Sequence, residues 1–109
     1  MQEASTSNRE NMNSRVQIDE LVIDAVKSLA HDHDIDELAS PSLDTRVYSN
    51  LDSFAVLDLI LDLERRIQNQ MGHYIQIADE NTFDPTLTPF QTVSHIADYL
   101  MRKIVGAVG

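Results

Sequence analysis

Apolar residues recur at helical spacing after a polar start, and they predict an amphipathic helix. The stripe consists of Ile18, Leu21, Val22, Ala25 and Leu29, which fall on one face of a helix with 3.6 residues per turn. Ser14 and Gln17 have the spacing of a capping box, so the helix is expected to begin there. It is expected to end over His31–Asp34, because these residues neither extend the stripe nor favour helix interiors.

The stretch NLDSFAVLDLILDLE, residues 50–64, holds more apolar residues than one buried helix face needs. It predicts a second helix from about residue 53 to about residue 69. One stripe, suited to a core, contains Leu59, Ile60, Leu63 and Ile67. A second stripe on the adjoining face contains Phe54, Leu57 and Leu61. Because a small bundle could not fully cover both, we expect the second stripe to be an exposed docking surface.

The connecting segments have weaker patterns. Between the first two helices the apolar residues do not recur at regular spacing, which indicates a long loop. Its isolated apolar residues suggest that the loop is pinned to the core: Ile35, Leu38, Leu43, Val47 and Leu51. Gly72 marks a break after the second helix. A short third helix is expected near Asp79–Phe83, before Pro85.

The last helix is indicated by a stripe of Val93, Ile96, Ala97, Leu100 and Ile104. Either Thr88, followed by a proline, or Thr92 could cap its start. Three long helices and one short helix predict an all-α protein, a small four-helix bundle with a long first loop.

Composition and charge narrow the class of protein. A chain of 109 residues suggests one domain over residues 15–105, with a disordered tail over residues 1–14 and a frayed end over residues 106–109. The formal charge of -10 disfavours nucleic acid and anionic membranes as partners and favours a basic protein surface. The absence of cysteine excludes disulfides and thiolate chemistry. Without a signal-peptide pattern or an apolar run of ~18 residues, a soluble, cytoplasmic monomer is expected.

Residues that could carry catalysis or bind a metal are few. His31 and His33 do not share a helix face and have no evident third ligand, so a solvated helix end is favoured over a metal site. The sequence contains no glycine-rich phosphate loop, nucleophile elbow or triad spacing. We therefore expect a protein that is not itself an enzyme.

Asp52 and Ser53 at the start of the second helix have two interpretations. Serine is a preferred N-cap, since its oxygen accepts a hydrogen bond from a free backbone N–H. A helix N-terminus is also a favourable place for a phosphate group. The apolar stripe beside this hydroxyl suggests that capping is not its only role.

At these residues the chain resembles the acyl carrier protein family. The family motif is Asp-Ser-Leu at the start of its second helix, and residues 49–54 here read SNLDSF. The segment VLDLILDLERRI is similar to the family's second helix, and IQIADE to its approach to the third. FQTVSHIADYL is similar to the Thr-Val-x-x-x-x-x-Tyr-Ile pattern of the fourth, which favours Thr92 as the cap. The resemblance covers most of residues 15–105.

The resemblance implies that Ser53 carries a 4′-phosphopantetheine arm, attached from coenzyme A by a phosphopantetheinyl transferase. Asp52 would help to bind the magnesium ion of that enzyme. The thiol of the arm would hold an acyl or aminoacyl group as a thioester, enclosed by the inner stripe and the neighbouring helices. Further partners would be an acyl- or aminoacyl-loading enzyme and a downstream synthase or transferase.

Partner enzymes of the family typically present basic patches to an acidic second helix. The expected contact residues here are Phe54, Leu57, Asp58, Leu61, Asp62, Glu64, Arg65 and Arg66. Arg65 and Arg66 stand where acids are usual. They either repel generic basic partners or simply pair with Asp62 at i, i+3 and i, i+4.

Other departures concern the turn before the helix and the length of a connection. Asn50 stands where glycine is usual, and it tolerates the left-handed conformation that the turn would need. The segment over residues 68–92 is longer than in fatty-acid carriers. These differences favour a discrete carrier of a specialised pathway. The alternative is an acidic helical interaction module without a prosthetic group.

Overall fold

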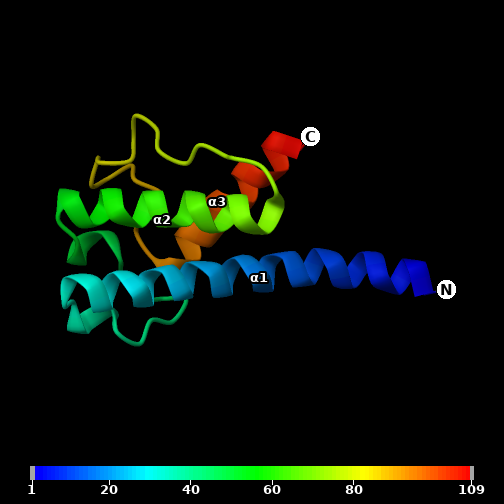
Figure 1. The fold of residues 1–109 in the computed structure, drawn as a ribbon, viewed down its shortest axis with the longest axis horizontal. Helices are drawn as coiled ribbons and strands as arrows, with labels where there is room; N and C mark the ends of the chain where they lie inside the picture. The colour runs from blue at the N-terminus through cyan, green and yellow to red at the C-terminus, as the bar shows by residue number, and fades with distance from the viewer. Residues whose placement is uncertain (1, 109) are drawn as a thin grey trace.

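Three α-helices form the body of the molecule in a computed structural model (Figure 1). The structure describes the backbone of residues 2–108 and the side chains of residues 15–106. The helices are α1 (Gln2–His33), α2 (Ser53–Met71) and α3 (Val93–Val108), with short 3₁₀ turns η1 (Asp36–Leu38) and η2 (Tyr48–Asn50). Since these residues include no β-strand, the all-α prediction is confirmed, but the α-helices number three and not four.

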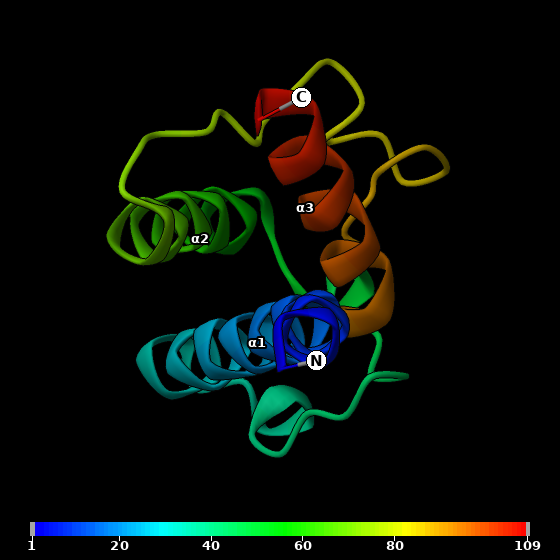
Figure 2. The ribbon, with the colours of Figure 1, turned by 90° about the vertical axis from the view of Figure 1, so that its right-hand side faces the viewer.

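The core is built from the stripes that the sequence predicts. α1 packs against both α2 and α3. Figure 2 looks nearly along α1 and α2, with α3 running obliquely beside them. The five stripe residues of α1, the inner stripe of α2 and the five stripe residues of α3 are all buried. The connecting segments add Leu38, Val47, Ile75, Ile77 and Phe90 to this core. The long first loop is therefore pinned as predicted, although its Leu43 is exposed.

α1 begins earlier than the sequence predicts and ends where expected. Its backbone is helical from Gln2, so Ser14 and Gln17 lie inside the helix and do not cap its start. The physical reason is that residues 2–13 contain no glycine or proline to interrupt a helix. Two further predictions concern residues whose side chains lie largely outside the described part of the chain: disorder of residues 1–14 and fraying of residues 106–109. Both stay predictions. After His33, Asp34 adopts a positive φ of 55°, which ends the helix.

α2 and α3 have the boundaries that their sequences indicate. Gly72 follows α2 with a φ of 86°, and its N–H donates to the carbonyl of Gln68, which is a glycine C-cap. Thr92 precedes α3, and its Oγ1 accepts a hydrogen bond from the N–H of His95. Thr88, the alternative cap, lies in the connecting segment before the helix.

The expected short helix near Asp79–Phe83 is a series of turns. Asp79 Oδ1 accepts a hydrogen bond from the N–H of Asn81 at 2.9 Å, and Thr82 Oγ1 accepts one from the N–H of Asp79 at 2.8 Å. These side chains compete with helical backbone bonds for the same N–H groups. The prediction of a fourth helix is therefore wrong.

The segment over residues 72–92 is instead fastened to the helices at Ile77. The N–H of Ile77 donates to Glu64 Oε2 of α2 at 2.9 Å, and its carbonyl accepts a hydrogen bond from the Tyr99 hydroxyl of α3 at 2.5 Å. The same hydroxyl lies 3.0 Å from Asp79 Oδ2. Burial raises the pKa of Tyr99, and the hydrogen bond to Asp79 raises it further. One residue of an irregular segment thus ties α2 to α3.

Candidate functional site: the start and outer face of α2

Asp52 caps α2, and Ser53 does not. The Asp52 carboxylate accepts a hydrogen bond from the N–H of Ala55 at 2.8 Å, and its backbone is extended, as an N-cap requires. Ser53 is the first helical residue, and it is exposed. The expectation that Ser53 serves as the cap is therefore wrong. Because the capping position precedes it, the Ser53 hydroxyl is left uncommitted to the helix terminus.

The turn before α2 does not use a left-handed residue. Among the described residues other than glycine, only Asp34 has a positive φ, so Asn50 does not adopt the conformation that the sequence suggested. Asn50 closes η2, and its side-chain amide donates to the carbonyl of Arg46 at 2.9 Å. The N–H of Leu51 then donates to the carbonyl of Tyr48. A side-chain hydrogen bond thus replaces the flexibility that glycine would supply at this turn.

The second apolar stripe of α2 is exposed, as predicted. The exposed fractions are 76% for Phe54, 45% for Leu57 and 56% for Leu61. The inner stripe of the same helix is almost fully buried. Ser53 therefore lies at one end of an apolar surface that the described side chains leave uncovered.

The charged residues of α2 are partly engaged within the chain. Asp62 accepts hydrogen bonds from both Arg65 and Arg66, the latter at 3.0 Å, so the pairing that the sequence allowed is confirmed. Arg66 also donates to Ser28 Oγ of α1 at 3.1 Å. Asp58 Oδ2 lies 2.8 Å from His33 Nε2 at the end of α1.

Glu64 is not part of the outer surface. Its side chain is buried, and its carboxylate accepts the hydrogen bond from Ile77 described above. This carboxylate is therefore engaged within the fold, which disfavours the predicted contact of Glu64 with partners. The physical reason is that a buried backbone N–H needs an acceptor, and the remote segment over residues 72–92 supplies that N–H.

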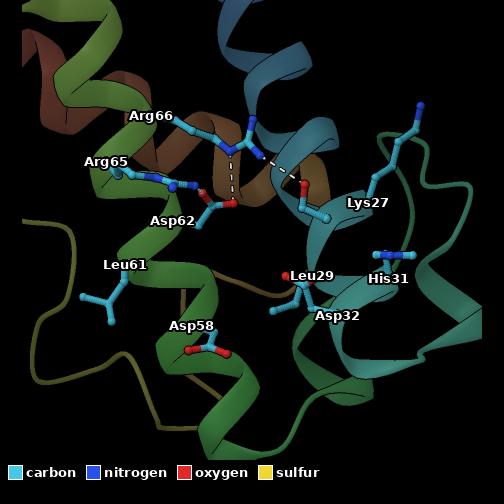
Figure 3. A pocket seen from close by; sticks show the side chains of 10 residues that line it. Lys27, Leu29, His31, Asp32, Asp58, Leu61, Asp62, Arg65 and Arg66 are labelled. Carbon is cyan, nitrogen blue, oxygen red and sulfur yellow. Dashed lines mark hydrogen bonds and ion pairs between the residues drawn. The ribbon is translucent and has the colours of Figure 1, made fainter.

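A groove between α1 and α2 lies beside this outer surface (Figure 3). Its volume is about 720 Å³, and its lining includes Lys27, Asp32, Asp58, Leu61, Arg65 and Arg66. The residues from α1 were not recognised as site residues from the sequence. Lys27 and His31 have the i, i+4 spacing of neighbours on one helix face, beside the core stripe. That spacing indicates a shared helix face in the sequence, but only the packing of α1 on α2 shows that this face lines a groove.

The described part of the chain contains neither a cluster of metal ligands nor a membrane-spanning helix. Within it, no group of three or more His, Cys, Asp or Glu side chains could hold a metal ion. None of its helices combines the length and the apolar character needed to cross a membrane.

The sequence and the structure were also compared with known proteins. No family model, no curated protein and no solved structure matches this chain.

Proposed function

We propose that this protein is an acyl-carrier-like protein that holds an acyl or aminoacyl group on a 4′-phosphopantetheine arm attached to Ser53. The observation that carries the proposal is the exposed Ser53 hydroxyl at the first position of α2, directly after an aspartate that already caps the helix. This placement supports the resemblance in the motif, because a hydroxyl that receives a group must be accessible. The apolar stripe beside it offers a surface for the enzymes that load and unload the carrier.

The residues at this site fit such a group. The Ser53 oxygen would form the bond to phosphorus, the hydroxyl would lose its proton, and the nucleotide part of coenzyme A would leave. One Asp52 oxygen accepts the capping bond, and a carboxylate has further lone pairs to offer the transferase's magnesium ion. The bound arm would supply the thiol that a chain without cysteine lacks.

Intact mass after incubation with coenzyme A, magnesium and a broad-specificity phosphopantetheinyl transferase tests this proposal. The wild-type protein should gain one phosphopantetheine, and Ser53→Ala should gain none. Ser49→Ala is a matched control, since Ser49 is an exposed serine in the preceding turn, and it should be modified like the wild type. Modification of Ser53→Ala would contradict the assignment.

The role of Asp52 is tested separately. Asp52→Asn keeps a good N-cap but removes the charge, so it should fold normally and be modified more slowly. A normal rate would contradict the magnesium role without affecting Ser53.

A second candidate function is an acidic helical interaction module without a prosthetic group. The exposed stripe of Phe54, Leu57 and Leu61 favours it, because such a stripe serves docking with or without an arm. A folded wild-type protein that gains no mass with the transferase would support this function over the carrier.

A further inference from the structure

The groove between α1 and α2 has two differently charged ends. Arg66 of α2 is bonded to Ser28 of α1, and Asp58 of α2 is bonded to His33 of α1, so the two helices run antiparallel along the groove. Lys27 therefore lies at the level of Arg66, whereas residues near His33 lie at the level of Asp58. Arg65 and Arg66 lie at one end of the groove, where they pair with Asp62, whereas Asp58 and Asp32 lie at the other end. Leu61 of α2 lies at a level between the two ends (Figure 3).

The groove is electrically balanced on a strongly acidic protein. Its lining contains three cations, Lys27, Arg65 and Arg66, and three carboxylates, Asp32, Asp58 and Asp62. The formal charge of -10 is thus carried by the rest of the chain. A small anion is a poor occupant, because it would lie beside the carboxylates of the groove as well as beside its cations. A uniformly basic surface is also a poor occupant, since Lys27 and Arg65 would repel it.

The spacing of the two ends fits an α-helix as the occupant. Asp58 and Arg65 are two turns apart on α2, which corresponds to about 10 Å at 1.5 Å per residue. On another helix, side chains at i and i+7 span the same distance on one face. An apolar side chain at i+3 or i+4 would then lie between them, opposite Leu61, whose exposed fraction is 56%.

We propose that this groove binds an amphipathic helix of a partner protein that carries one acidic and one basic side chain two turns apart, with an apolar side chain between them. The acidic side chain lies toward Lys27 and Arg65, and the basic one toward Asp32 and Asp58. Leu61 is the apolar anchor, and the exposed Leu57 extends its surface. The groove needs no arm on Ser53, so the proposal does not depend on modification of Ser53, although Leu57 and Leu61 belong to the stripe that the proposed function also uses.

Two synthetic helical peptides of about 18 residues test the proposal, a length above the ~12–15 residues at which isolated helices are marginal. Both carry the same leucine stripe. One has an acidic and a basic residue two turns apart beside it, and the other has lysine at all polar positions of that face. Binding is measured by fluorescence anisotropy to Ser53→Ala protein, so that no arm contributes. At ~0.15 M salt or above, where distant charges are screened, the mixed-charge peptide should bind more tightly.

Variants locate the binding and test the role of charge. Leu61→Asn should weaken binding of the mixed-charge peptide by about tenfold or more, since it removes the apolar contact that the bound peptide would bury. Leu87→Asn is the matched control, because Leu87 is similarly exposed (60%) in the segment over residues 72–92 and should not change the affinity. Arg65→Glu should weaken the mixed-charge peptide by about two- to fivefold and improve the lysine peptide. Arg46→Glu, an exposed site outside the groove with the same change in charge, should not reverse the preference.

Two outcomes would overturn the proposal. One is equal weakening by Leu61→Asn and Leu87→Asn, which would show that the peptide binds apolar surface without using the groove. The other is tighter binding of the lysine peptide than of the mixed-charge peptide to Ser53→Ala protein that keeps Arg65, at ~0.15 M salt or above. That result would show that Lys27 and Arg65 do not select the occupant.

Discussion

In the proposed carrier, Asp52 and Ser53 divide two tasks that a single serine would otherwise have to combine. A serine that caps a helix directs its oxygen to a backbone N–H, and that oxygen is then poorly placed to react. Here Asp52 takes the capping bond from Ala55, and Ser53 is exposed at the next position. In the proposed carrier, the aspartate keeps the helix start intact while the neighbouring hydroxyl is modified.

The division of roles at this helix start predicts unequal effects on stability. Asp52→Ala should lower the free energy of unfolding by about 1 kcal/mol, because it leaves the N–H of Ala55 without its acceptor. Ser53→Ala should change it by about 0.5 kcal/mol or less, since Ser53 is exposed and does not cap. Urea denaturation of both variants measures the difference. A loss for Ser53→Ala as large as that for Asp52→Ala would show that the serine supports the helix start after all.

α2 serves two purposes with two faces. Its inner stripe fills the core between α1 and α3, whereas its outer stripe is left to solvent beside Ser53. Burial of Glu64 and pairing of Asp62 with two arginines reduce the negative field along the helix. The charges that still face solvent at its start include Asp58, which is half-exposed beside His33.

Substitution by alanine should separate the two faces of α2. Leu63→Ala should lower the free energy of unfolding by about 2–5 kcal/mol, because Leu63 is fully buried and its removal leaves a cavity. Leu57→Ala and Leu61→Ala should cost about 1 kcal/mol or less, but should slow modification of Ser53 by the transferase. Thermal unfolding and modification rates of the three variants check this. Equal and large losses of stability would mean that the outer stripe is part of the core.

The helices and their buried faces could be predicted from periodicity, because period 3.6 and burial are directly linked. The role of Glu64 could not, since its partner, the N–H of Ile77, is supplied by a segment remote in sequence. The turns at Asp79 and Thr82 were also missed, because local side-chain bonds compete with a helix without changing the apolar pattern. The residues of α1 that line the groove could not be predicted either, because only the packing of α1 on α2 brings them beside α2.

At the scale of the whole molecule, a chain with a formal charge of -10 is held together partly by specific polar links between helices. Arg15 of α1 donates to Asp98 of α3 at 2.5 Å, and Arg66 of α2 donates to Ser28 of α1. Tyr99 of α3 adds a link to Ile77 through a buried hydroxyl. Burial and the hydrogen bond to Asp79 raise the pKa of this phenol above its ordinary value.

Ionisation of Tyr99 should therefore limit the stability of the fold at high pH. A tyrosine in the unfolded chain ionises near pH ~10, whereas burial raises the pKa of Tyr99 in the folded protein. Above the ordinary value the unfolded state binds fewer protons than the folded state, so the free energy of unfolding falls as pH rises. Tyr99→Phe should be less stable at neutral pH by about 1 kcal/mol, because it loses the bond to Ile77. Its stability should nevertheless decline less steeply above pH ~10.

Tyr74→Phe is the control, since Tyr74 is exposed and its ionisation should contribute less to the slope. Urea unfolding of the three proteins across the alkaline range measures these slopes, and parallel curves for wild type and Tyr99→Phe would show that this phenol does not control the alkaline limit.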